Sequence, residues 1–180
     1  MKNKKILYIS ATVIVLVATL LVSIRYYDSY NASKASASSL STNQQNSLDL
    51  INHYRKSKGL KELVWNDQLA QAAALKIEDE QVYNYFDHVS PEGKKAWDFI
   101  SQSGYEYRFA GENLAIDFSD LNDAFDAWTK SPTHLENIIS DKYDDFGFAS
   151  REALINGKKT VLMVQMFGSE LSIYDRILYK

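Results

Sequence analysis

The feature that most constrains this chain is a run of 19 uncharged residues at positions 6–24, ILYISATVIVLVATLLVSI. A helix rises about 1.5 Å per residue, so this run would span roughly the hydrocarbon core of a bilayer. Lys2, Lys4 and Lys5 precede the run, whereas only Arg25 follows it closely. This asymmetry of basic residues predicts a cytoplasmic N-terminus with the rest of the chain outside the cell.

A cleaved signal peptide is the alternative to an uncleaved signal anchor. Signal peptides have a shorter apolar region, of about 7–15 residues, and a small-x-small cleavage site close to its end. The clear match to such a site, Ala35-Ser36-Ala37, lies well beyond the run. We therefore favour an anchor, which predicts a single-pass protein of the cell membrane with its C-terminal domain extracellular. Cleavage would instead give a secreted protein.

The charge distribution separates the N-terminal part from the remainder. Of the chain's 20 basic and 23 acidic side chains, five bases but only one acid, Asp28, lie in residues 1–46. The stretch after the apolar run is rich in Ser, Ala, Asn and Gln and cannot bury enough apolar surface to fold, so it reads as a linker. The predicted organisation is a cytoplasmic basic N-terminus (1–5), a transmembrane segment (6–24), a linker (25–46), a folded domain (47–169) and a tail (170–180).

Composition excludes several classes of site and partner. The chain has no cysteine, which excludes disulfides, thiolate metal sites and a lipid-modified cysteine anchor. Its formal net charge is −3, which argues against a protein that coats nucleic acid. No nucleic-acid partner is expected.

The folded domain reads as helices followed by strands. Helical periodicity and capping residues predict four helices, over about 47–59, 66–85, 92–103 and 119–132. Two strand-like runs follow, 146–149 and 161–167, and the Asn156-Gly157 pair between them is a strong hairpin signal. This order predicts an α+β fold with helices packed on an antiparallel sheet. Trp65, Trp97 and Trp128 each lie beside apolar positions and are expected to be buried.

Three histidines and one glutamate are the residues to weigh as functional. His88 and His134 each follow a predicted helix, where a loop would expose them on a rigid frame. His53 lies among polar residues of the first predicted helix and reads as a surface side chain. Glu112 stands between Gly111 and a short apolar run, so it is either a solvated acid in a turn or a partly buried acid that needs a partner.

These segments together resemble the bacterial branch of the CAP superfamily, also called SCP-like extracellular proteins. The resemblance covers about residues 47–168, and the segments occur in the family's order. They are Leu63-Val64-Trp65-Asn66, Leu69-Ala70-Gln71-Ala72-Ala73, Phe86-Asp87-His88-Val89-Ser90-Pro91-Glu92-Gly93, Gly111-Glu112-Asn113-Leu114-Ala115, Ala127-Trp128-Thr129-Lys130-Ser131-Pro132-Thr133-His134-Leu135-Glu136-Asn137-Ile138 and Phe146-Gly147-Phe148-Ala149.

The resemblance implies a three-layer α-β-α sandwich with a surface cleft lined by two histidines and two acids. His88 and His134 match the histidines, which can hold a divalent metal such as zinc, and Glu112 matches one acid. The position of the second acid is Ser131 here, so a mechanism that needs two carboxylates lacks one of them. Asn113 and Ser131 are expected to add hydrogen bonds to a ligand in the same cleft.

Two functions remain open from the sequence. The first is a membrane-tethered or secreted binding module that holds a metal, a lipid or a cell-envelope component. The second is a metal-dependent hydrolase, a peptidase or nuclease, that uses His88, Glu112 and His134. Ser131 is a further candidate for a catalytic role, as a Ser–His pair with His134, although no nucleophile elbow is present. Whether the protein is an enzyme stays open.

Overall fold

A computed structural model describes residues 40–172 of the chain. The predicted transmembrane segment, most of the linker and most of the tail lie outside these residues. No helix within residues 40–172 is both long enough and apolar enough to cross a membrane.

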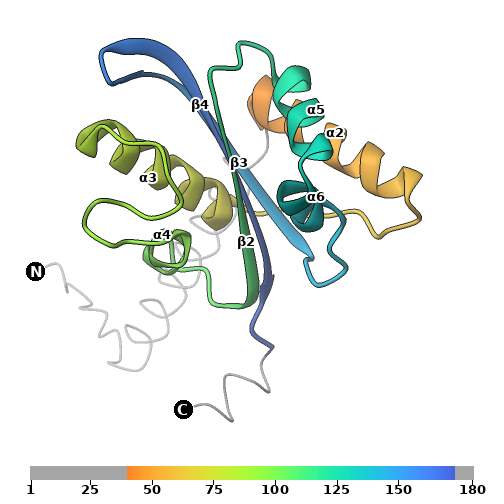
Figure 1. Cartoon of the computed structure of the whole chain (residues 1–180). Helices are drawn as coiled ribbons and strands as arrows, with labels where there is room; N and C mark the ends of the chain where they lie inside the picture. Colours follow the sequence, from red (N-terminus) through yellow and green to blue (C-terminus); the bar gives the residue numbers. More distant parts are fainter. Residues whose placement is uncertain (1–39, 173–180) are drawn as a thin grey trace, which may run out of the picture. The chain divides into compact units, whose positions relative to one another are not determined.

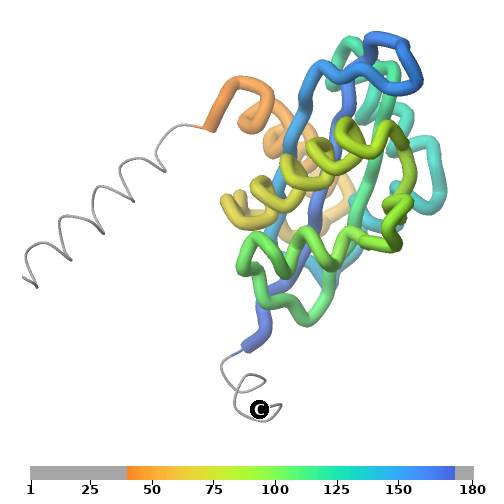
Figure 2. Tube along the Cα trace, turned by 90° about the vertical axis from the view of Figure 1, so that its left-hand side faces the viewer, coloured from red at the N-terminus to blue at the C-terminus, as the bar shows by residue number. Residues whose placement is uncertain are grey.

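The described domain is a three-layer sandwich, with a four-stranded sheet between two layers of helices (Figure 1). Helices α3 and α4 cover one face of the sheet, and α2, α5 and α6 cover the other (Figures 1 and 2). The elements are α2 Thr42–Ser57, β1 Val64–Trp65, α3 Asp67–Tyr83, α4 Ala96–Gln102, β2 Tyr107–Ile116, α5 Leu121–Lys130, α6 Pro132–Ile139, β3 Asp145–Ile155 and β4 Lys158–Glu170. The expected three-layer α-β-α arrangement is confirmed.

The sheet has the strand order β1-β3-β4-β2. Strands β3 and β4 form a hairpin whose turn is Asn156-Gly157, as predicted, with φ angles of 51° and 77° at these two residues. Positive φ at both central residues is the type I′ geometry that matches the twist of the strands. The prediction of a purely antiparallel sheet is wrong, because the short strand β1 pairs parallel to β3.

Strand β2 was not predicted from the sequence. It carries the Gly111-Glu112-Asn113 segment, which suggested a turn because all three residue types are rare in strands. In the structure Gly111–Ala115 are all buried, and β2 pairs antiparallel with β4 at the edge of the sheet. Of the two alternatives for Glu112, the solvated acid in a turn is wrong, because Glu112 is a buried residue of a strand.

The outer edge of β2 is covered by side chains. Three carbonyl groups at alternate residues of the strand each accept a hydrogen bond from a side chain of the neighbouring helical layer. The pairs are Tyr143 Oη to Ala110 O at 3.1 Å, Asn137 Nδ2 to Glu112 O at 3.0 Å, and Trp128 Nε1 to Leu114 O at 2.9 Å. A covered edge is protected from pairing with another chain, and it fixes β2 against α5 and α6.

Helix α2 begins at Thr42, within the segment assigned to the linker. Its N-cap is Ser41, whose hydroxyl accepts a hydrogen bond from the Gln44 backbone, while the Gln44 side chain accepts one from the Ser41 backbone. This capping box is a helix-start signal in an otherwise linker-like sequence. The helix ends as predicted before Gly59, where φ is +72° and the Leu60 N–H donates to Arg55 O.

Three other sequence predictions need correction. Trp128 is buried, at 1% exposure, but Trp65 is only half-buried and Trp97 is 40% exposed. Pro132 does not only end a helix: it occupies the first turn of α6, so His134 lies on a helix and not in a loop. The third helix is also shorter than predicted and begins at Ala96, after a turn at Gly93, where φ is +83°.

Candidate functional site

The centre of the candidate site is a contact between His88 and Glu112. His88 lies between α3 and α4, and Glu112 lies on β2. The His88 Nδ1 and Glu112 Oε1 atoms are 2.6 Å apart. The Glu112 side chain is 3% exposed, whereas the His88 side chain is 57% exposed. A buried carboxylate thus holds an exposed imidazole and leaves its Nε2 atom free for a ligand.

The two histidines of the site differ in their electrostatics. The hydrogen bond that His88 donates to Glu112 raises the pKa of His88 above its ordinary value, against an opposing effect of burial. Burial lowers the pKa of His134, and the charge of His88 lowers it further. His134 is not among the residues that line the pocket at His88, so the convergence of the two histidines in one cleft stays a prediction.

Asn113 is fully buried and ties β2 to the helix that carries His134. Its Nδ2 atom donates to the His134 carbonyl at 3.2 Å and to Gln165 Oε1 at 3.1 Å, and its Oδ1 atom accepts from Asn137 Nδ2 at 2.9 Å. Both polar atoms of its side chain are therefore engaged in hydrogen bonds with other residues of the protein. Asn113 positions the His134 backbone, and the expectation that it meets a ligand directly has no support in these contacts.

Asn137 and Tyr143 are site residues that the sequence reasoning missed. Asn137 Nδ2 donates both to Asn113 and to the Glu112 carbonyl, and Asn137 Oδ1 accepts from the Tyr143 hydroxyl at 3.2 Å. Gly111 permits this arrangement, because a Cβ atom there would lie 2.5 Å from Tyr143 Oη. The sequence did contain a signal for Asn137: it lies three residues after His134, which places both residues on the same face of a helix.

Ser131 does not join the central contact. It is the N-cap residue of α6, and its hydroxyl lies 3.3 Å from the Thr133 hydroxyl. Within residues 40–172 no hydrogen bond links the Ser131 side chain to either site histidine. A Ser–His nucleophile pair therefore finds no support in the structure.

Behind the site lies a buried ion pair that was not predicted. Lys76 and Glu80, one turn apart on α3, are both fully buried, with Lys76 Nζ 3.5 Å from Glu80 Oε1. Lys76 also donates to the Tyr85 hydroxyl at 3.0 Å. Burial raises the pKa of Glu80 to about 7, and the nearby charge of Glu112 adds to that rise. Glu80 is thus electrostatically coupled to the site, although it does not touch it.

A small pocket opens beside the central contact. It has a volume of about 270 Å³, and it brings together the segment after α3, the start of α4, the strand β2 and helix α6. Its lining residues are His88, Val89, Lys95, Ala96, Trp97, Ala110, Gly111, Glu112 and Asn137. The exposed Trp97 therefore forms part of the wall of the site.

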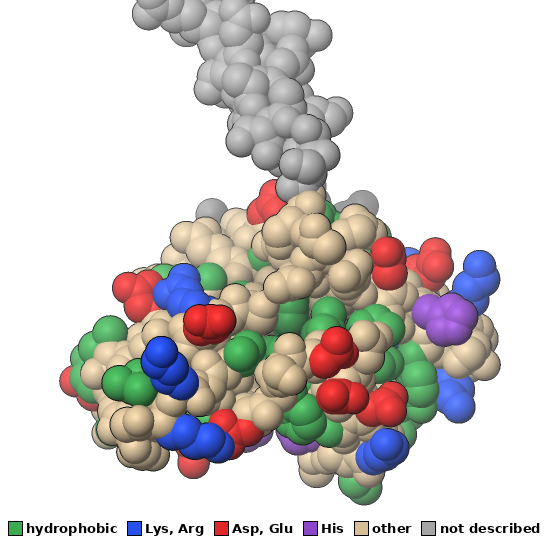
Figure 3. Space-filling view, turned by 90° about the horizontal axis from the view of Figure 1, so that it is seen from above, with side chains coloured by type: hydrophobic (Ala, Val, Ile, Leu, Met, Phe, Trp, Pro, Cys, Tyr) green, Lys and Arg blue, Asp and Glu red, His purple; other side chains and the backbone are tan. Residues whose placement is uncertain are grey.

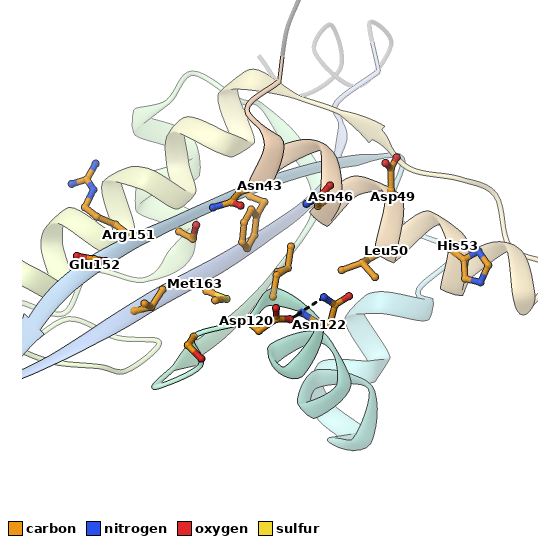
Figure 4. A pocket seen from close by; sticks show the side chains of 15 residues that line it. Asn43, Asn46, Asp49, Leu50, His53, Asp120, Asn122, Arg151, Glu152 and Met163 are labelled. Carbon is orange, nitrogen blue, oxygen red and sulfur yellow. Dashed lines mark hydrogen bonds between the residues drawn. The ribbon is translucent and has the colours of Figure 1, made fainter.

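A larger hollow lies between α2, the start of α5 and the β3–β4 hairpin, with a volume of about 690 Å³. Figure 3 shows this side of the molecule, with apolar side chains in the middle and acidic side chains around them. The close view places Asn43, Asn46, Asp49 and His53 along α2, opposite Asp120 (Figure 4). His53 belongs to this hollow and not to the His88 pocket, so it is separate from the candidate site.

The side chains of the site offer few donor atoms to a metal ion. In the described residues no group of three or more His, Asp or Glu side chains is arranged to hold a metal ion. One oxygen of Glu112 is already engaged by His88. A metal ion at His88 and His134 would therefore have two imidazole ligands, fewer than the three or four protein ligands that are usual for zinc.

Comparison with known proteins identifies the relatives of this chain. The model of the CAP family, described as the cysteine-rich secretory protein family, matches residues 48–167. The chain is 32% identical over 117 residues to the uncharacterized protein YkwD of Bacillus subtilis and 31% identical over 106 residues to the uncharacterized membrane protein YlbC of the same organism. These matches cover 65% and 59% of this chain but only 46% and 31% of the relatives.

Solved structures show the same fold. An extracellular protein containing an SCP domain from Bacillus anthracis superposes with a TM-score of 0.62 at 28% identity, over 71% of this chain and 40% of that one. An outer surface protein of Borrelia burgdorferi gives a TM-score of 0.59 at 22% identity, over 69% of this chain and 90% of that one.

Proposed function

This chain belongs to the CAP family, and from that premise we propose that its extracellular-type domain is a binding module whose ligand site is the His88 cleft. The observation that supports this function is the 2.6 Å contact between buried Glu112 and exposed His88. A fixed imidazole at the mouth of a pocket is suited to hold a ligand or a cation without further reorganisation.

The proposed module holds a divalent cation, such as zinc, between His88 and His134. A metal ion bound there would act as a Lewis acid toward oxygen atoms of the ligand. Glu112 fixes the His88 tautomer, and Asn113 holds the backbone of His134. With two protein ligands the cation keeps open positions, so a metal-coordinating envelope component is the ligand class we favour over a simple lipid.

We do not extend the proposal to hydrolysis by a peptidase or nuclease. That function would use His88, Glu112 and His134 on a bound substrate, with a metal-bound water as the nucleophile. A mechanism with two carboxylates lacks the second one here, because Ser131 stands at its position and the Ser131 hydroxyl lies against Thr133.

The proposed location is the cell membrane, with the domain outside and residues 6–24 as the anchor. The apolar run and the lysine asymmetry support this location, and one relative is named as a membrane protein. The secreted form remains the alternative if the run is cleaved.

Isothermal titration calorimetry with zinc chloride at neutral pH tests the cation site. We expect one binding event per chain in the wild type and none in the His88→Ala/His134→Ala double variant. His53→Ala is the matched control, because His53 lines a different hollow, and it should bind zinc as the wild type does. An absence of heat in the wild type, or equal binding by the double variant, would exclude the cation site.

A further inference from the structure

Trp97 is an aromatic residue in an unusual place. It lies in the first turn of α4, where Ala96, Phe99 and Ile100 are buried in the core, yet Trp97 itself is 40% exposed. Tryptophan is highly buried on average, and exposed tryptophans that line pockets are frequent anchors for ligands. The buried residues of α4 are enough to pack the helix on the core, so packing does not account for a tryptophan at position 97.

The indole ring of Trp97 packs against a second aromatic ring. The rings of Trp97 and Tyr107 pack against each other, with their centroids 6.3 Å apart and their planes inclined by 41°. Tyr107 is half-buried on β2 and also contacts the core on the α3 side. Trp97 is thus supported on one side by Tyr107 where it lines the His88 pocket, and an apolar surface that is positioned in advance binds a flat ligand at little entropic cost.

The pocket beside Trp97 is ring-sized and combines an apolar wall with polar groups. Its volume of about 270 Å³ falls just below the range of about 300–1,000 Å³ that holds drug-sized ligands. Trp97 and Val89, both exposed, supply the apolar surface, while His88, Glu112 and Lys95 supply polar groups. A sugar ring has this dual character, since its C–H face packs on an aromatic ring and its hydroxyl groups form hydrogen bonds at the edge.

The charges at the pocket favour an acidic ligand. The one acid in its lining, Glu112, is engaged by His88, whereas the lining cation Lys95 has no ion pair within residues 40–172. An unpaired lining cation beside a neutralised acid selects a negatively charged ligand by charge complementarity.

We propose that the His88 pocket receives one sugar ring of an acidic glycan, with the ring stacked on Trp97 and its acidic group near Lys95. This inference rests on the proposed function, since it names the ligand class of the same pocket. The acidic group is a carboxylate or a phosphate, and a sugar of a cell-wall polymer can carry either. Recognition of the ring by Trp97 is what distinguishes a glycan from an acidic peptide.

Binding of four probes to the full-length chain in mild detergent tests the inference. The probes are a uronic-acid tetrasaccharide, a sugar-phosphate oligomer, a neutral tetrasaccharide and an acidic tetrapeptide. We expect at least one of the two acidic saccharides to bind, with its affinity lowered about tenfold by Trp97→Ala and retained more fully by Trp97→Tyr. Lys95→Gln should weaken the acidic saccharide and leave any weak binding of the neutral one unchanged.

The control variant is Tyr83→Ala, because Tyr83 is also 40% exposed but lies outside the pocket. It should bind the saccharides as the wild type does. Equal saccharide binding by wild type and Trp97→Ala, preference for the peptide, or no saccharide binding would overturn the inference. Zinc calorimetry distinguishes this inference from the proposed cation site. If the wild type binds zinc but no saccharide, the glycan inference alone is rejected. If the wild type binds no zinc, the proposed cation site is rejected.

Discussion

The carboxylate of Glu112 determines the properties of His88. It is nearly fully buried, it accepts the hydrogen bond from His88 Nδ1 at 2.6 Å, and that bond keeps the opposite ring nitrogen exposed. A carboxylate in this position stabilises the charged imidazolium, which raises the pKa of His88. The same bond fixes which nitrogen of the neutral ring is available to a ligand.

Replacing Glu112 by Gln should return the pKa of His88 toward its ordinary value of 6.5. The amide keeps the shape of the side chain but removes the negative charge that favours the protonated ring. In the wild type, histidine NMR titration should place the pKa of His88 above that of His134, whose pKa is lowered by burial. An unchanged pKa of His88 in the variant would show that Glu112 does not control it.

The stability that this contact adds has a definite pH dependence. Because the pKa of His88 is raised on folding, its contribution is fully present below pH 6.5 and is lost as the pH rises through the folded pKa. The stability difference between wild type and Glu112→Gln should therefore shrink with rising pH.

Glu80 should make the folded state less stable as the pH rises from about 4.5 to 7. Its pKa is raised from 4.5 to about 7, mainly by burial, so the folded state holds a proton that the unfolded chain releases. Urea unfolding at a series of pH values measures this effect. Glu80→Gln should flatten the profile in this interval, and a profile equally steep in the variant would assign the pH dependence to other groups.

Trp128 connects α5 to the edge of β2. Its ring is 1% exposed in the core between the sheet and the α2, α5 and α6 layer, and its Nε1 donates to the Leu114 carbonyl. Trp97 lies on the opposite layer and contributes to a pocket wall. Trp128 is therefore a residue of the core, whereas Trp97 lines a pocket at the surface.

Trp128→Ala should lower the free energy of unfolding by about 3–5 kcal/mol, because it leaves a large cavity and removes the donor to β2. Trp97→Ala, in which the ring is partly exposed, should lower it by much less. Chemical denaturation of both variants gives the comparison. Equal losses would contradict the distinction between a core tryptophan and a pocket tryptophan.

Local signals in the sequence predicted the elements that depend on local chemistry. Asn66 caps α3 through its side chain, Asn156-Gly157 closes the β3–β4 hairpin and Gly59 ends α2. Each is decided by the backbone preferences of a few neighbouring residues. These elements could be predicted without knowledge of the rest of the fold.

The elements missed from the sequence depend on tertiary contacts. Strand β2 contains residues that disfavour strands, and it exists because β4 pairs with it and side chains from α5 and α6 cover its other edge. Tyr143 donates to the Ala110 carbonyl and Asn137 to the Glu112 carbonyl, both from positions more than 20 residues further along the chain. The family resemblance pointed to His88, Glu112 and His134, but it could not show that Trp97 lines the pocket of His88 and Glu112.

For the whole molecule, we propose that the domain carries the ligand site and that residues 6–24 hold it at the membrane. The domain holds its fold with no cysteine, through two apolar cores on either side of the sheet. An uncleaved anchor would keep the His88 pocket near the membrane, while a linker of Ser, Ala and Asn residues would let the domain reach envelope components.

The full-length protein should fractionate with membranes, and external protease should release the folded domain from intact cells. The reason is the uncharged 19-residue run, which is long enough to span a bilayer, with lysines on its cytoplasmic side. Immunoblotting of fractions from cells that express the chain provides the measurement. A soluble product that begins near Ser38 would show that the run is a cleaved signal peptide.

The central claim is that His88 and His134 hold one cation at the mouth of the Glu112 pocket. Crystals of the protein grown with zinc, measured on both sides of the zinc absorption edge, locate the metal without any assumption about the site. We expect one anomalous peak bonded to a nitrogen of His88 and a nitrogen of His134, each at about 2.0–2.1 Å. A peak on His53 alone, or no peak at the two site histidines, would contradict it.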